Sequence, residues 1–114
     1  MYSVTYDMKI SVYAIAKNES KFADRWADSM SEADEIVVLD TGSSDDTVEK
    51  LTKRGVKVTS KSICPWRFDV ARNESMKLVS ADSDILVCTD LDEVFVSGWR
   101  AKLEHAWSEA MHNG

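Results

Sequence analysis

The sequence predicts an α/β domain in which a mostly parallel sheet is covered by helices on both faces, giving three layers. Short apolar runs alternate four times with stretches of helical length and pattern. Such alternation favours parallel strands joined by right-handed crossovers. With 114 residues, 44% of them hydrophobic, the chain can bury a real core. It shows no internal repeat and no Gly/Ser linker, so we expect residues 1–114 to form a single domain.

The expected strands are four apolar runs. They cover 8–16, 35–39, 56–60 and 85–89. The run EIVVL at 35–39 is compact and rich in β-branched residues, which is typical of a central parallel strand. The run VKVTS at 56–60 alternates between apolar and polar residues and predicts a shorter strand.

The expected helices cover 20–30, 45–54, 69–80 and 97–111. Ser20 and Ser97 are the expected N-caps of the first and the last of these helices. The second has acids in its first turn and basic residues in its last, which suits the helix dipole. Gly55 then provides a left-handed stop.

The tryptophans and cysteines divide between core and loop. We expect Trp26, Trp99 and Trp107 in the core, because they lie on apolar helical stripes. Trp66 lies in the loop 63–68 and is expected to wall a cleft. Cys64 and Cys88 belong to no C-x-x-C pattern and have no histidine nearby, so we expect two buried, reduced thiols.

The composition excludes several classes of partner. A formal net charge of −6 argues against nucleic acid, which needs a basic surface. No stretch approaches the roughly 20 apolar residues of a membrane span, and no basic cluster favours a membrane surface. Residues 1–9 lack the basic and apolar segments of a secretory signal, so we expect a cytoplasmic protein. An acidic protein can still bind an anionic ligand if a divalent cation lies between them.

Polar and acidic residues follow three of the expected strands. Lys17-Asn18-Glu19 follows the first, the turn from Asp40 to Asp45 follows the second, and Asp90-Leu91-Asp92-Glu93 follows the last. Ligands of open α/β sheets bind beyond the carboxyl ends of the strands. The sequence therefore places its candidate site at that edge.

Asp90-Leu91-Asp92 is the sharpest local feature. Residues two apart on an extended chain point the same way, so both carboxylates would face one cleft and repel each other. Mg²⁺ or Mn²⁺ would relieve that repulsion, since these ions take carboxylate oxygens together with substrate phosphates. The alternative is an acidic turn after a strand without a ligand. Glu93 more simply braces this loop than acts as a base.

Two further residues have open roles. Asp40 either accepts a hydrogen bond from a nucleobase or ribose, or bonds the backbone N–H groups of the turn Gly42–Ser44. Arg72 either contacts a phosphate or a carboxylate in the cleft, or forms a surface salt bridge.

Four ordered blocks resemble the family 2 glycosyltransferases with the Rossmann-like GT-A fold. They are ISVYAIAKNES (10–20), DEIVVLDTGSSDDTVE (34–49), PWRFDVARNESMKLV (65–79) and DILVCTDLDEVF (84–95). The D-T-G-S turn is most similar to the branch of lipopolysaccharide core glucosyltransferases and peptide S-glycosyltransferases.

The resemblance implies a nucleoside-diphosphate sugar as donor, commonly a UDP-sugar, with Mg²⁺ or Mn²⁺ and inverting transfer. It implies that Ala16, Asn18, Glu19 and Asp40 surround the nucleoside and that Arg72 borders the donor site. It further implies that Asp90, with Leu91, contacts the ribose or sugar, and that Asp92, together with Asp90, ligates the metal.

The resemblance has two departures. Thr41 stands where many relatives carry a second Asp, and the chain ends about twenty residues after Glu93. The family's acceptor-binding half, which carries the catalytic base, has no counterpart, so we assign no catalytic residue. We expect apolar surface at the last strand and helix, and therefore self-association, a missing partner domain or marginal stability. The alternatives are a nucleotide- or metal-binding module without transfer activity and an unrelated metal-dependent phosphotransfer fold.

Overall fold

The computed structural model describes residues 8–113, with side chains through residue 110. Its sheet has four parallel strands in the order β3-β2-β1-β4. The strands are β1 (Ile10–Ala16), β2 (Glu35–Asp40), β3 (Lys57–Ser60) and β4 (Ile85–Cys88). The helices are α1 (Ser20–Ser29), α2 (Thr47–Lys53), α3 (Phe68–Met76) and α4 (Trp99–Asn113). The predicted alternation of strands and helices is confirmed.

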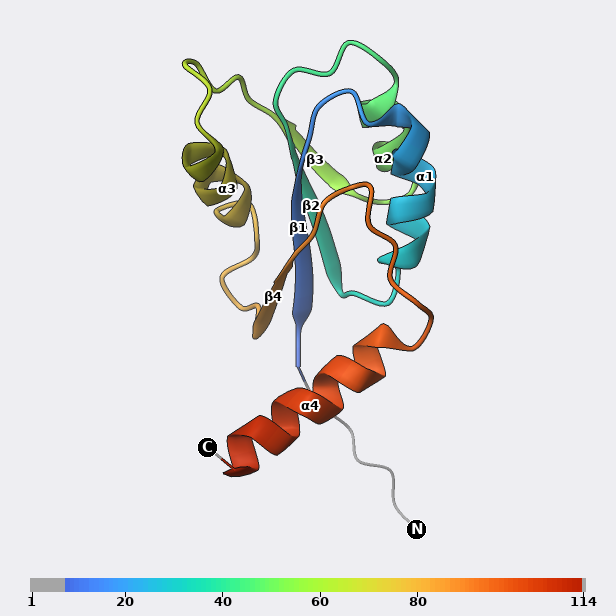
Figure 1. Cartoon of the computed structure of the whole chain (residues 1–114), viewed down its shortest axis with the longest axis vertical. Helices are drawn as coiled ribbons and strands as arrows, with labels where there is room; N and C mark the ends of the chain where they lie inside the picture. The colour runs from blue at the N-terminus through green and yellow to red at the C-terminus, as the bar shows by residue number, and fades with distance from the viewer. Residues whose placement is uncertain (1–7, 114) are drawn as a thin grey trace.

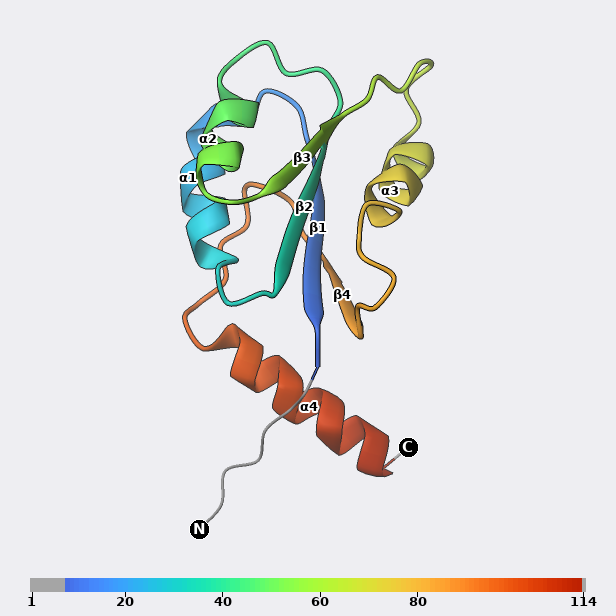
Figure 2. The same cartoon turned by 180° about the vertical axis from the view of Figure 1, so that it is seen from behind.

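Helices cover both faces of the sheet, as predicted. Figures 1 and 2 show α1 and α2 on one face, α3 on the other, and α4 crossing near the amino ends of the strands. The two inner strands are the longest and the most buried, whereas β3 and β4 have four residues each. The hydrophobic runs therefore occupy the centre, as expected of parallel strands covered on both faces.

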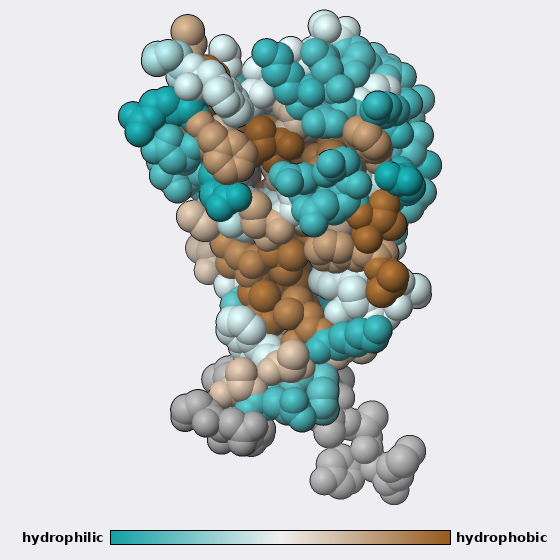
Figure 3. All heavy atoms as spheres, in the orientation of Figure 1, coloured by the Kyte–Doolittle hydropathy of each residue, from teal (hydrophilic) through white to brown (hydrophobic). Residues whose placement is uncertain are grey.

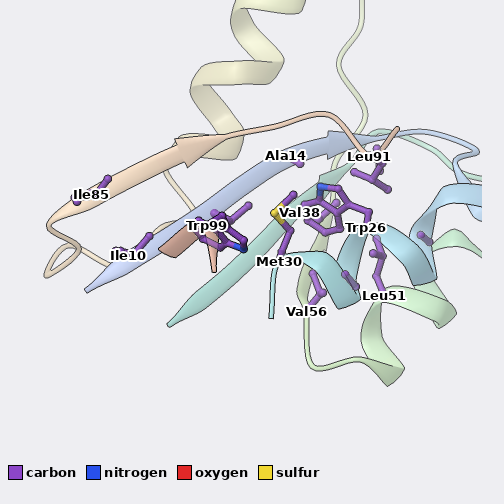
Figure 4. Packing of buried hydrophobic residues seen from close by; sticks show 14 residues of the cluster. Ile10, Ala14, Trp26, Met30, Val38, Leu51, Val56, Ile85, Leu91 and Trp99 are labelled. Atoms are coloured by element: carbon purple, nitrogen blue, oxygen red, sulfur yellow. The ribbon is translucent and has the colours of Figure 1, made fainter. Parts of the chain in front are cut away.

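The core lies between the sheet and α1. Ala23, Trp26, Ala27 and Met30 present one helical face to β1 and β2, and Trp26 and Met30 are fully buried. Figure 4 shows Trp26 and Met30 packed near Val38, with Leu91 beside Trp26. The predictions for Trp26 and Trp99 are confirmed. The prediction for Trp107 is wrong, because α4 projects past the sheet and leaves 41% of that side chain exposed.

The helix boundaries differ from the predictions where distant residues intervene. α4 begins at Trp99 because the Glu32 carboxylate accepts the N–H groups of Gly98 and Arg100, so Glu32 replaces Ser97 as the cap. α3 ends at Met76. The chain then continues in turns closed by hydrogen bonds between residues three apart, from the Leu78 N–H to the Ser75 carbonyl and from the Val79 N–H to the Met76 carbonyl. That tightening brings the Ser80 N–H to Glu35, at 2.9 Å.

The starts of the first two helices also differ in detail. α2 begins at Thr47, because the Asp45 carboxylate accepts the Thr47 N–H at 3.0 Å instead of starting the helix itself. Ser20 begins α1 but does not cap it with its side chain, since its hydroxyl donates to Asp46. Gly55 ends α2 with a φ of 82°, as predicted.

An apolar surface lies beside β4 and the start of α4. Leu86, Val94 and Val96 are exposed, and the adjacent groove of about 490 Å³ is lined by Val87, Val94, Phe95, Val96, Trp99 and Leu103. Figure 3 shows apolar side chains gathered across the middle of this face. The expected apolar surface is present, and self-association stays a prediction. None of the helices within residues 8–113 has the length and hydropathy needed to cross a bilayer.

Candidate functional site

A cleft of about 600 Å³ opens at the carboxyl edge of the sheet. The chain moves from β1 outward to β2 and β3, then returns to place β4 on the other side of β1. A reversal of strand order of this kind leaves a crevice beyond the strand ends, where ligands of α/β sheets bind. The cleft is lined by Ile15, Lys17, Glu19, Thr41, Ser62, Ile63, Cys64, Trp66, Phe68 and Asp90.

Three carboxylates converge on this edge from two strands. Glu19 follows β1, while Asp90 and Asp92 follow β4 and are exposed. Partial burial and then the negative charges of Asp92 and Asp90 raise the pKa of Glu19 above its ordinary value. Charge repulsion at this edge therefore acts on Glu19, and the predicted repulsion between Asp90 and Asp92 themselves stays a prediction.

The acidic loop after β4 is fixed by one buried side chain and by hydrogen bonds to one carboxylate. Leu91 is 2% exposed and packs in the core, which anchors the loop between its two aspartates. The Glu93 carboxylate accepts the Asp90 N–H at 2.7 Å and the Thr89 hydroxyl at 3.2 Å. The predicted bracing role of Glu93 is confirmed, and the carboxylates of Asp90 and Asp92 are left facing solvent.

The Asp40 carboxylate accepts hydrogen bonds from the turn that follows it. Its side chain is buried and accepts the N–H groups of Gly42 and Ser43 at 3.2 and 3.0 Å, together with the Ser43 hydroxyl. Of the two roles left open by the sequence, the structure has the bond to the turn. Contact of Asp40 with a nucleoside stays a prediction.

Asn18 joins the ends of β1 and β2. It has a positive φ of 53°, and its side-chain oxygen accepts the Ser44 N–H at 2.8 Å. Its own N–H donates to the Ser43 hydroxyl at 2.8 Å. Ala16 is buried in the core, and its carbonyl accepts the Thr41 N–H at 2.9 Å. Asn18 and Ala16 thus support the cleft floor rather than line it.

Arg72 lies on α3, exposed, with its guanidinium 5.0 Å from the centre of the Phe68 ring. Among the described residues no carboxylate lies within ion-pair distance of Arg72, and the nearby surface pair joins Arg67 to Asp69 at 2.8 Å instead. The salt-bridge alternative is therefore wrong for Arg72. Arg72 is not among the residues that line the cleft, and it borders the cleft through its contact with Phe68, which does line it.

Sequence reasoning missed part of the cleft lining. The sequence pattern indicates no role for Lys17, nor for Ser62, Ile63 and Phe68 in and beside the loop before α3, yet all four line the cleft. The last three belong to the segment after β3, so the rule about carboxyl ends was the signal that could have found them. Trp66 lines the cleft as predicted.

The cysteine prediction is half right. Both thiols are free, but both are exposed, Cys64 in the cleft lining and Cys88 at the end of edge strand β4. Burial was expected from the habits of the residue type, and the loop and the sheet edge override that habit.

The described residues do not form a preformed metal cage. No group of three His, Cys, Asp or Glu side chains in the described part of the chain is close enough to hold an ion alone. Mg²⁺ and similar ions commonly use one or two carboxylates and complete their shell with water and substrate phosphates. Two exposed aspartates on a braced loop fit that pattern.

The fold and the acidic cleft define a Rossmann-like domain of the GT-A type. The model of glycosyl transferase family 2 matches residues 11–113, and the chain belongs to that family. An uncharacterised glycosyltransferase of Rickettsia conorii is 33% identical over 106 residues, which are 92% of this chain and 36% of that protein. Placement in the D-T-G-S branch stays a prediction.

Solved structures give the same family. Glucosyl-3-phosphoglycerate synthase of Mycobacterium tuberculosis is 31% identical, with a TM-score of 0.65 over 77% of this chain and 36% of that one. The same enzyme with Mn²⁺, UDP and glucosyl-3-phosphoglycerate has a TM-score of 0.62, covering 74% of this chain and 33% of that one. It has also been solved with Mg²⁺ and UDP. The chain thus spans about a third of the length of these relatives.

Proposed function

We propose that the cleft binds a nucleoside-diphosphate sugar, with a UDP-sugar favoured, as the donor site of a glycosyl transfer reaction. The observation that carries the proposal is the meeting of Glu19 and Asp90 in an open cleft at the carboxyl edge, with the charge of Asp92 near enough to raise the pKa of Glu19. Clustered acids of this kind disfavour an anionic ligand unless a divalent cation comes with it. Relatives that bind UDP together with Mn²⁺ or Mg²⁺ support this ligand pair.

Asp90 and Asp92 are the proposed ligands of Mg²⁺ or Mn²⁺. Both are exposed carboxylates on a loop anchored by Leu91, and oxygen donors suit either ion. When bound, the cation would supply positive charge to the diphosphate as it leaves the sugar. The cluster of acids explains why the site would need it.

The proposed nucleoside contacts divide into direct and supporting ones. Glu19 lines the cleft and is placed to contact the ligand itself. Asp40, Asn18 and Ala16 act by fixing the turns that follow β1 and β2. Arg72, with no carboxylate partner among the described residues, is placed to meet negative charge at the side of the cleft.

Transfer itself would need an acceptor and a base that takes its proton, because inverting transfer proceeds by direct attack on the anomeric carbon. The chain spans 36% of the M. tuberculosis enzyme, and we assign the role of this base to no residue described in the structure. We therefore propose that this chain contributes donor binding. A cytoplasmic location and one domain over residues 1–114 belong to the same proposal.

Calorimetric titration of UDP, GDP and CDP, with and without Mn²⁺, tests this function. We expect one nucleotide to bind only with the metal, and Asp92→Asn to weaken it by at least tenfold, since a metal ligand is lost. Asp28→Asn, which removes the same charge from an exposed position on α1, should bind like wild type. A folded protein that binds no nucleotide with Mn²⁺ would overturn the proposal.

A further inference from the structure

The cleft has an aromatic side that the acids do not explain. Trp66 and Phe68 line it, with Ile63 beside them, and we call Trp66 and Phe68 the aromatic wall. Trp66 is 55% exposed and Phe68 is 51% exposed. Large aromatic side chains left open to water inside a cleft are typical of binding surfaces rather than of packing.

Neighbouring charges hold part of the aromatic wall in place. The Arg72 guanidinium stands 5.0 Å from the centre of the Phe68 ring, on the helix that begins at Phe68. Arg67 and Asp69, on either side of Phe68 in the sequence, pair with each other at 2.8 Å. The Arg72 contact restricts the Phe68 ring before any ligand arrives, which lowers the entropy lost on binding.

The aromatic wall and the acids come from different parts of the sheet. The wall belongs to the segment after β3, at one edge of the strand order, whereas Glu19 and Asp90 follow β1 and β4. One cleft therefore offers a flat apolar surface and a separate acidic end suited to a cation and phosphates. A nucleoside diphosphate has the matching two parts, a planar base and a charged diphosphate.

We propose that the nucleobase stacks on Trp66, with Phe68 completing the surface. The proposal rests on the donor-binding function and adds where the base lies. A hydroxyl-rich sugar needs several polar partners, and the wall supplies almost none, whereas every base has a π-face that stacks on an aromatic ring. Stacking alone tolerates different bases, so the choice among them falls to polar lining groups such as Lys17, Thr41 and Ser62.

The test compares a ligand that carries a nucleobase with one that does not. Trp66→Ala should weaken UDP binding in the presence of Mn²⁺ by about tenfold or more, the usual range for loss of one stacked ring. Binding of pyrophosphate with Mn²⁺ should stay unchanged, because it makes no contact with the wall. Trp66→Phe should restore most of the UDP affinity. Trp107→Ala, which removes an exposed tryptophan on α4, is the matched control.

The outcomes separate this proposal from the one on which it rests. If wild type binds UDP with metal, Asp92→Asn abolishes binding and Trp66→Ala binds normally, only the stacking proposal fails. Equal weakening of UDP and pyrophosphate by Trp66→Ala would mean a structural role and would also overturn it. Weakening of a UDP-sugar but not of UDP would place the sugar on the wall instead. If wild type binds no nucleotide with metal, both proposals fall.

Discussion

Carboxylates gather at both ends of the sheet, and Asp34 at the amino edge and Glu19 at the carboxyl edge have opposite electrostatics. At the amino edge, Asp34 accepts the Ile10 N–H at 2.9 Å and an Arg100 guanidinium N–H at 2.8 Å, and the Arg100 hydrogen bond chiefly holds the pKa of Asp34 below its ordinary value. At the carboxyl edge, burial and the charges of Asp92 and Asp90 raise the pKa of Glu19.

Glu35 is the extreme case at the amino edge. Burial alone would raise its pKa, but hydrogen bonds from Ser80, Lys57 and Ser11 outweigh that and lower it to about 2. The comparison teaches that hydrogen bonds outweigh burial at Asp34 and Glu35, whereas burial and the charges of neighbouring acids prevail at Glu19. Unfavourable electrostatics that persist in a native cleft are a mark of function.

Removing the charge of Glu35 at the amino edge should have the largest effect on the free energy of unfolding. Glu35→Gln removes the charge that accepts hydrogen bonds from Ser80 and Lys57 in a buried place, and we expect a loss of about 3 kcal/mol in the free energy of unfolding. Urea denaturation measures it. Glu49→Gln, exposed on α2, is the control and should change stability little. A loss no larger than that of the control would show that the Glu35 network contributes nothing.

Acid should remove the same stabilisation. Because the pKa of Glu35 is lower in the folded chain, its contribution is present above its ordinary value of about 4.5 and is lost as the pH falls toward about 2. The shift corresponds to about 3 kcal/mol. Asp34 and Glu32 act in the same direction. Urea denaturation at a series of pH values should show this decline in wild type and a shallower one in Glu35→Gln. Parallel curves would contradict the assignment.

Removing the charge of Glu19 at the carboxyl edge should have the smallest effect on the free energy of unfolding. This effect should be stabilising, opposite in sign to that of Glu35→Gln. The pKa of Glu19 is raised in the folded chain, so its favourable contribution is full below about 4.5 and lost at neutral pH. Glu19→Gln should therefore increase the free energy of unfolding at pH 7, on the order of 0.5 kcal/mol. The gain should shrink in acid, where wild type is protonated. Destabilisation at pH 7 would mean that the Glu19 charge is used by the fold.

Most elements were predictable because their signals are local. The runs that became β1 and β2 are mostly apolar, and Gly55 ends α2 with the left-handed φ that favours glycine. The carboxyl-edge rule placed Glu19 and Asp90 in one region before any coordinates, because parallel strands end on the same side. The bracing role of Glu93 followed from its adjacency to the Asp90–Asp92 loop.

The failures share a physical cause, which is a partner far away in the sequence. Glu32 caps α4 across 66 residues, so the local signal at Ser97 was overridden. Trp107 lies on an apolar stripe, but α4 projects past the sheet and 41% of this side chain is exposed. Local patterns indicate which face of a helix is apolar, and only packing decides whether something covers it.

By itself the sequence determined the alternation of strands and helices, the parallel sheet, the edge that carries the acids and the family to compare. Only the tertiary structure decided which of those acids are satisfied. Asp40 ends the inner strand β2 and Glu19 follows the inner strand β1, yet Asp40 bonds its own turn while Glu19 meets the two aspartates that follow β4. The reason is that hydrogen bonds and charge repulsion act over a few ångströms in space, and distance along the chain does not fix that separation.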